Sequence, residues 1–179
     1  MKYLALLRGI NVGGNKKVPM EDLKEYFFAK GFSNVSTILN TGNVVFQSEK
    51  QQKVVENEVA ELLHENFNFQ IPSFIYKEEE LIEFLNDNNV NELISTVEKG
   101  QKIIFTFAKD LKVSEIEVLK RANELSIVHW NNSMLCLHFS VDRMGTPVIM
   151  KLLDSAIKKR GTSRNLNTLK KIITKLETL

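Results

Sequence analysis

One order of elements is predicted twice along the chain of 179 residues, and this repeat constrains the fold more than any other feature of the sequence. Apolar runs of strand length and apolar residues at helical spacing define the elements. In the first half they are predicted at residues 3–8, 19–31, 35–39, 43–47, 52–66 and 69–76. The order is β-α-β-β-α-β, and Pro72 indicates that the last of these strands lies at a sheet edge.

The same order restarts after an acidic helix at residues 78–85 and a polar linker that ends near Gly100. The second set of elements is predicted at residues 102–107, 114–125, 127–130, 134–139 and 146–156. Ser114 and Glu117 predict a capping box at the start of its first helix. In place of a sixth strand, an apolar stripe predicts an amphipathic C-terminal helix with Leu166, Leu169, Ile172, Ile173 and Leu176 on one face.

These elements predict an α+β fold of two similar β-α-β-β-α halves, each ferredoxin-like, followed by the C-terminal helix. Residue identity between the halves is slight, so the duplication is inferred from the order of elements alone. The N-terminal half is assigned to residues 1–88, the linker to 89–100 and the C-terminal half to 101–179.

The first strand is apolar on both of its faces. Tyr3, Ala5 and Leu7 alternate with Leu4 and Leu6, and alternate residues of a strand point to opposite faces of the sheet. Since helices on one side leave the second face open, something must cover that face. The other half of the chain is expected to do so, and a homodimer partner is the alternative.

The sequence contains 43% apolar and 26% charged residues, which is typical of a globular protein. No stretch approaches the roughly 20 apolar residues needed to cross a bilayer. The apolar run near the N-terminus is too short for a signal peptide. Cys136 is the single cysteine, so no intrachain disulfide is expected, which agrees with a reducing compartment. These features predict a cytoplasmic protein.

The net charge is only +2, but the charge is unevenly distributed. Basic residues exceed acidic ones by three in residues 1–48 and by six in residues 150–179, whereas acids exceed bases by eight in residues 49–100. The simplest interpretation is a set of solvated helix faces that offset one another. The alternative is that the two basic segments converge on an anionic ligand.

The loop at residues 9–18 is the main difference between the halves. It is longer than its counterpart at residues 108–113, holds three of the eight glycines, and ends with Lys16 and Lys17 before a helix. Glycines allow backbone N–H groups to turn toward a ligand, and the N-terminus of a helix favours anions. The loop is neither a P-loop nor a Gly-x-Gly-x-x-Gly fingerprint. An anion-binding loop, an ordinary long turn and a protein-contact loop all stay open.

Three motifs carry a resemblance to a known family. They are Leu6-Leu7-Arg8-Gly9-Ile10-Asn11-Val12-Gly13-Gly14 with Lys17-Val18-Pro19-Met20, then Thr41-Gly42-Asn43-Val44-Val45-Phe46, and finally Thr162-Ser163-Arg164-Asn165-Leu166-Asn167-Thr168. With them, the chain resembles the bacterial family called domain of unknown function 1697 over essentially its whole length. The resemblance implies a two-part α+β structure and a set of signature residues, and it implies no activity.

The candidate ligand-binding residues come from the loop and these motifs. They are Arg8, Gly9, Asn11, Gly13, Gly14, Lys17, Asn43, Arg164 and Asn165. We expect Arg8, Lys17 and Arg164 to converge beside Gly13 and Gly14, because the loop is the main difference between the halves, both basic segments are terminal, and all three residues lie in the family-like motifs. In such a pocket each guanidinium would supply a planar fork and the ammonium a mobile point charge.

The sequence therefore favours a small-anion or nucleotide-binding module that uses the glycine-rich loop. A protein-interaction or structural module is the first alternative, and an enzyme acting on a phosphorylated small molecule is the second. No nucleophile or acid–base pair can be named, so the catalytic residues are unknown. No cofactor or metal is expected, since His129 and His138 have no neighbouring ligand at metal spacing. Nucleic acid is not an expected partner, because no basic-Gly-aromatic strand motif is present.

Overall fold

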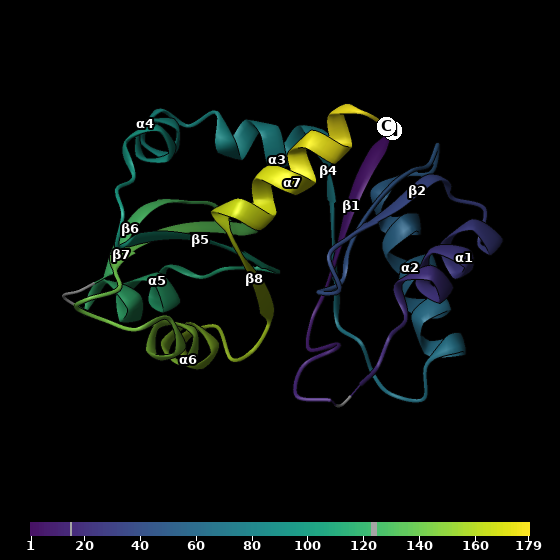
Figure 1. The fold of residues 1–179 in the computed structure, drawn as a ribbon, viewed down its shortest axis with the longest axis horizontal. Coiled ribbons are helices and arrows are strands. Elements are labelled where there is room, and N and C mark those ends of the chain that lie inside the picture. Colours follow the sequence, from purple (N-terminus) through teal and green to yellow (C-terminus); the bar gives the residue numbers. More distant parts are fainter. Residues whose placement is uncertain (15, 123–124) are drawn as a thin grey trace. The chain divides into compact units, whose positions relative to one another are not determined.

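A computed structural model describes residues 1–14, 16–122 and 125–179. The chain forms two compact units (Figure 1). The first unit comprises Met1–Leu81 and Lys170–Leu179, and the second comprises Ile82–Leu169. Each unit contains one four-stranded antiparallel sheet.

The sheet of the first unit has the strand order β2-β3-β1-β4, so β1 and β3 are central. The elements are β1 (Lys2–Leu7), α1 (Met20–Ala29), β2 (Ser33–Ile38), β3 (Asn43–Gln47), α2 (Gln52–Asn66), β4 (Ser73–Lys77) and the start of α3 (Glu78–Leu85). On β1, Ala5 pairs with Val44 of β3 and Ile75 of β4. As expected from Pro72, which directly precedes β4, this strand lies at an edge of the sheet.

One face of this sheet packs against α1 and α2 (Figure 1). Tyr3, Ala5 and Leu7 of β1 share a buried cluster with apolar residues of the two helices, which are Leu23, Phe27, Val55, Val59, Leu62 and Leu63. These helical residues recur at three- and four-residue spacing, which places them on one side of each helix. The opposite face of the sheet carries Leu4 and Leu6 and is also apolar. That the other half of the chain or a homodimer partner covers this face stays a prediction.

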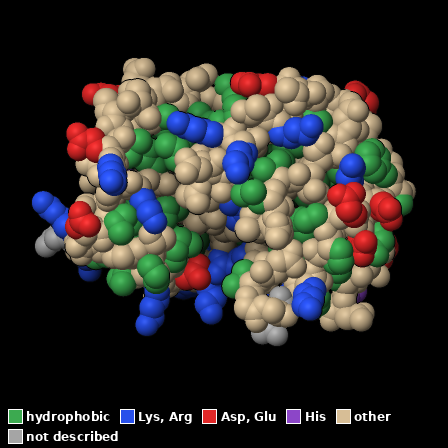
Figure 2. Space-filling view, viewed as in Figure 1, with side chains coloured by type: hydrophobic (Ala, Val, Ile, Leu, Met, Phe, Trp, Pro, Cys, Tyr) green, Lys and Arg blue, Asp and Glu red, His purple; other side chains and the backbone are tan. Residues whose placement is uncertain are grey.

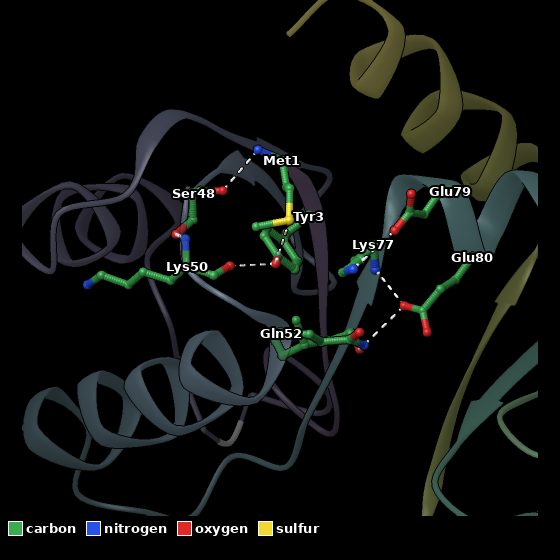
Figure 3. Close-up of polar contacts among 9 residues, drawn as sticks. Met1, Tyr3, Ser48, Lys50, Gln52, Lys77, Glu79 and Glu80 are labelled. Carbon is green, nitrogen blue, oxygen red and sulfur yellow. Dashed lines mark hydrogen bonds and ion pairs between the residues drawn. The ribbon is translucent and has the colours of Figure 1, made fainter.

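Polar contacts close one end of this sheet (Figure 3). The hydroxyl of Tyr3 donates to the carbonyl oxygen of Lys50 at 2.7 Å. Oε2 of Glu80 accepts from the backbone N–H of Lys77 at 2.8 Å and from Nε2 of Gln52 at 3.0 Å. Glu80 therefore caps the start of α3 and joins it to the start of α2.

The sheet of the second unit has the equivalent order β6-β7-β5-β8. Its elements are the end of α3, α4 (Asn88–Thr96), β5 (Gln101–Ala108), α5 (Val113–Lys120), β6 (Leu125–Trp130), β7 (Met134–Ser140), α6 (Thr146–Ala156), β8 (Gly161–Asn165) and the start of α7 (Leu166–Glu177). Leu135 and Leu137 of β7 pack with residues of α5 and α6, among them Ile116, Ile149 and Leu153. The predicted α+β fold of two similar halves with a C-terminal helix is confirmed.

The strand β8 and the helix α4 were not predicted from the sequence. The sixth element of the second half is β8, which pairs with β5 from Ile104 opposite Asn165 to Ala108 opposite Gly161. It was missed because its residues, Gly-Thr-Ser-Arg-Asn, show no apolar alternation, and its place in the sheet depends on backbone hydrogen bonds. Residues 89–96, which were expected to belong to the polar linker at residues 89–100, form most of α4.

Several predicted boundaries also differ from the structure. The helix predicted at residues 114–125 ends at Lys120, and residues 123 and 124 lie outside the described residues. The capping box of Ser114 and Glu117 is wrong, because α5 begins at Val113 and the carboxylate of Glu115 accepts from the N–H of Lys112 at 3.1 Å. The strand predicted from Phe69 begins at Ser73 instead.

Among the described residues, no helix is long and apolar enough to cross a membrane.

Candidate functional site

The glycine-rich loop connects β1 to α1, and its backbone repeatedly enters the left-handed region. Gly13 and Gly14 are consecutive left-handed residues, with φ of 62° and 78°. A Cβ atom added at either position would meet nothing within 4 Å. Glycine is therefore favoured here by backbone conformation rather than by close packing, and the space beside this backbone is open.

The side chain of Asn11 holds the loop closed. Its Nδ2 donates to the carbonyl oxygens of Val18 and Asn40, each at 2.9 Å. Its Oδ1 accepts from the backbone N–H of Val18 at 2.8 Å, and its own N–H donates to the carbonyl oxygen of Lys16 at 3.1 Å. Asn11 was predicted to bind a ligand, but these bonds employ both hydrogens of its amide in holding the loop and the β2–β3 turn together.

A shallow hollow of about 450 Å³ lies between this loop, the start of α1 and the β2–β3 turn. It is lined by Asn11, Gly14, Lys17, Val18, Pro19, Met20 and Asn40. Three of these residues, Asn11, Gly14 and Lys17, were predicted from the sequence as site residues. The apolar residues Val18, Pro19 and Met20 were not predicted, and neither was Asn40, which lies on the β2–β3 turn and contacts Asn11.

The two lysines of the loop have different surroundings. Nζ of Lys16 lies 5.8 Å from the centre of the Phe69 ring, a cation–π contact that draws this lysine toward the α2–β4 connection. Lys17 is exposed and lines the hollow. Among the residues that the structure describes, Lys17 makes no hydrogen bond or ion pair. Its ammonium group is therefore available to a ligand in the hollow.

Arg8, Gly9 and Asn43 complete the predicted site residues of the first unit. Arg8 directly follows β1, is half-buried, and donates its backbone N–H to the carbonyl oxygen of Pro72 at 2.9 Å. Gly9 is exposed and left-handed, with φ of 71°. The side chain of Asn43 is buried, and its Nδ2 donates to the carbonyl oxygen of Ile38 at 2.8 Å. Asn43 therefore stabilises the β2–β3 hairpin.

Arg164 and Asn165 belong to the second unit. Arg164 is only 8% exposed, and its guanidinium donates to Oγ1 of Thr162 at 2.7 Å and to the carbonyl oxygen of Ser163 at 2.9 Å. Burial lowers the pKa of this guanidinium to about 10, because desolvation disfavours its charge. Asn165 caps α7, its Oδ1 accepting from the N–H of Thr168 at 2.8 Å. The convergence of Arg164 with Arg8 and Lys17 stays a prediction.

The basic segment at residues 150–179 contributes other cations to the surface of the second unit. Lys and Arg side chains gather at its lower edge in the space-filling view, over α6 and the turn that follows (Figure 2). Lys151, Lys158 and Lys159 are exposed there. In that turn, Arg160 donates to the carbonyl oxygens of Lys109 and Asp110 at 2.7 and 3.1 Å, so it braces two loops.

Cys136, His129 and Asp87 form a second cluster, which sequence spacing did not reveal. His129 of β6 pairs with Cys136 of β7, and Nδ1 of His129 lies 3.3 Å from Oδ2 of Asp87. Burial raises the pKa of the Cys136 thiol to about 12, and the charge of Asp87 adds to the effect. A thiol that stays protonated at neutral pH is a poor nucleophile, so this cluster does not have the chemistry of a catalytic thiolate.

No group of three or more potential metal ligands occurs in the described parts of the chain.

The fold and the loop define a class of protein in which two ferredoxin-like α+β units are joined in one chain and the first carries a glycine-rich loop after its first strand. The model of the family described as protein of unknown function (DUF1697) matches residues 1–133, and the chain belongs to this family. The match confirms the resemblance over these residues, which include the first two motifs. The third motif, at residues 162–168, lies beyond the matched range.

The fold also occurs in a solved structure, that of the conserved bacterial protein SP0830 from Streptococcus pneumoniae. The two proteins share 21% sequence identity, the match covers 98% of each chain, and the TM-score is 0.78. At this identity the similarity shows the fold alone. No curated protein matches the chain.

Proposed function

We propose that this protein binds a small anionic molecule in the hollow beside the glycine-rich loop. The observation that carries the proposal is the position of Lys17, an exposed ammonium that lines the hollow next to the open backbone of Gly14. A lysine is a compact point charge on a flexible stem, which suits a phosphate or carboxylate group.

The start of α1 adds to this environment. Pro19 is the N-cap residue of the helix, and its side chain makes no capping hydrogen bond to the first-turn N–H groups. The N-terminal end of a helix carries a partial positive charge that favours anions. Glu21 and Asp22 lie in the same turn and are exposed, so they offset part of that charge. Lys17 is therefore the main positive contribution to the hollow.

Binding rather than catalysis is favoured by the lining of the hollow. Among the described residues, its side chains are one ammonium, two amides and three apolar groups, and these include no nucleophile or acid–base pair. An enzyme that acts on a phosphorylated small molecule is the less favoured alternative.

A protein-interaction role is the second candidate, and one observation supports it. The side chain of Val12 is 70% exposed in the same loop, beside Gly13. An exposed aliphatic side chain in a loop can anchor a partner protein. That role predicts a partner whose binding depends on Val12 rather than on Lys17.

A thermal-shift experiment tests the anion site. The melting temperature of the purified protein is measured with inorganic phosphate, citrate, AMP and ATP. A ligand present at about 100 times its dissociation constant stabilises the folded state by about 2.7 kcal/mol, so at least one of these anions should raise the melting temperature by several degrees.

The variant Lys17→Ala should abolish the shift while leaving the melting temperature without ligand unchanged. Lys53→Ala is the matched control, because Lys53 is an exposed lysine of α2 that pairs with Glu56. Its shift should equal that of the parent. The proposal fails if no anion changes the melting temperature, or if the two variants respond alike.

A further inference from the structure

We infer that the ligand of the hollow is an organic phosphate monoester with an apolar body, rather than inorganic phosphate or a polyphosphate. This inference rests on the proposed function, because it concerns the same hollow. It follows from the charges, the apolar wall and the size of the site.

The positive charge that the described residues bring to the hollow suits a ligand with one phosphate group rather than several. Among the described residues that line the hollow, Lys17 is the only cation, since Lys16 lies over the ring of Phe69. A phosphate monoester carries about −1.5 to −2 charges at pH 7. Each further phosphate of a polyphosphate would add charge without a cationic partner in the hollow. It would also approach the exposed carboxylates of Glu21 and Asp22, which directly follow the lining residue Met20.

Part of the lining of the hollow is apolar. Val18, Pro19 and Met20 line it in succession, and Met20 packs against the core with part of its side chain exposed. A free phosphate ion is hydrated on all sides and gains nothing from such a wall. An organic group attached to the phosphate would bury apolar surface there, which stabilises a complex by about 25 cal/mol per Å².

One polar group is placed to contact the organic part. The side chain of Asn40 is exposed and, within the described chain, has no hydrogen-bond partner of its own, while its carbonyl oxygen is held by Asn11. An amide supplies both a donor and an acceptor. The hollow, at about 450 Å³, falls in the range of about 300–1,000 Å³ that small-molecule sites occupy.

Titration calorimetry with four probes tests the ligand class. The probes are inorganic phosphate, phenyl phosphate, AMP and ATP, without magnesium. We expect phenyl phosphate and AMP each to bind at least tenfold more tightly than inorganic phosphate, and ATP to bind no more tightly than AMP. Lys17→Ala and Lys17→Gln should each weaken AMP binding at least tenfold.

Lys16→Ala is the matched control within the loop, because Lys16 contacts Phe69 rather than the hollow, and it should change the affinity for AMP less than threefold. Three outcomes would overturn the ligand class and leave the anion site standing. They are tighter binding of ATP than of AMP, equal affinities for phosphate and phenyl phosphate, and a loss of AMP affinity in the Lys16 variant equal to that in the Lys17 variants. Absence of binding by all four probes would overturn both proposals.

Discussion

Gly42 illustrates how single residues set the geometry around the site. Its φ is 74°, and an added Cβ atom would lie 2.6 Å from Cβ of Leu7 and 2.9 Å from Cδ1 of Ile10. Its carbonyl oxygen accepts from the N–H of Leu7 at 2.7 Å. The β2–β3 turn thus lies directly against the end of β1 and the start of the loop. The motif Thr41-Gly42-Asn43 therefore has a packing explanation as well as a conformational one.

Replacing Gly42 by alanine should destabilise the protein by about 2–5 kcal/mol. A left-handed non-glycine residue costs about 1–2 kcal/mol, and overpacking adds about 1–3 kcal/mol. The free energy of unfolding is measured by urea denaturation. Gly31→Ala is the matched control, because Gly31 is also left-handed, with φ of 92°, but has open space around it. Equal losses in the two variants would show that packing at Gly42 contributes nothing.

At the scale of elements, α4 shows how one side chain converts a polar stretch into a helix. Oδ1 of Asp87 accepts from the N–H groups of Asn89 and Val90 at 3.0 and 3.3 Å, which caps the helix. Oδ2 of the same carboxylate contacts Nδ1 of His129 on β6. Val90 is buried. The helix is therefore stabilised by its cap, by one apolar anchor and by its contact with the sheet of the second unit.

Two substitutions at Asp87 separate the cap from the contact with His129. Asp87→Ala removes both and should lower the free energy of unfolding by about 1–2 kcal/mol. Asp87→Asn keeps an oxygen that can cap α4 and loses the negative charge, so it should cost less than about 1 kcal/mol. Chemical denaturation of both variants at neutral pH provides the measurement. If the asparagine variant were as unstable as the alanine variant, the cap would not be the main contribution.

At the scale of the whole molecule, α7 contributes residues to both units. Its first residues belong to the second unit, and residues from Lys170 onward belong to the first. Leu169, Ile172 and Leu176 are buried, as the predicted apolar stripe requires. Nζ of Lys2 donates to the carbonyl oxygen of Leu176 at 2.7 Å, which joins the end of α7 to β1.

Deletion of residues 165–179 should therefore lower the melting temperature by at least 10 °C or prevent folding. Burial of each large aliphatic side chain contributes about 1.5–3 kcal/mol, so the loss of three amounts to about 4.5–9 kcal/mol. Differential scanning calorimetry measures the change. Deletion of residues 178–179 alone is the control and should have little effect, because these residues follow the end of the helix. An unchanged melting temperature in the longer deletion would contradict the prediction.

The sequence by itself determined the features that depend on local periodicity. Apolar residues at two-residue spacing define β1, and apolar residues at three- and four-residue spacing define α2 and α7, because each pattern places these residues on one face of its element. The repeated order of elements follows from these local patterns. The glycines of the loop also carry a local signal, because a left-handed backbone conformation favours glycine whatever surrounds the residue.

The tertiary structure decided what depends on partners distant in the sequence. The strand β8 forms through backbone hydrogen bonds to β5, and backbone groups are the same in every residue, so side chains carry little signal for it. Asn11 was predicted as a ligand-binding residue because it lies in the glycine-rich loop and its motif. In the structure its amide hydrogens are bonded to Val18 and to Asn40, 29 residues away. The hollow depends on contacts that hold the β2–β3 turn against the loop, among them the bond from Asn11 to Asn40 and the packing of Gly42 on Leu7. A local sequence pattern of a few residues does not show which distant turns come together.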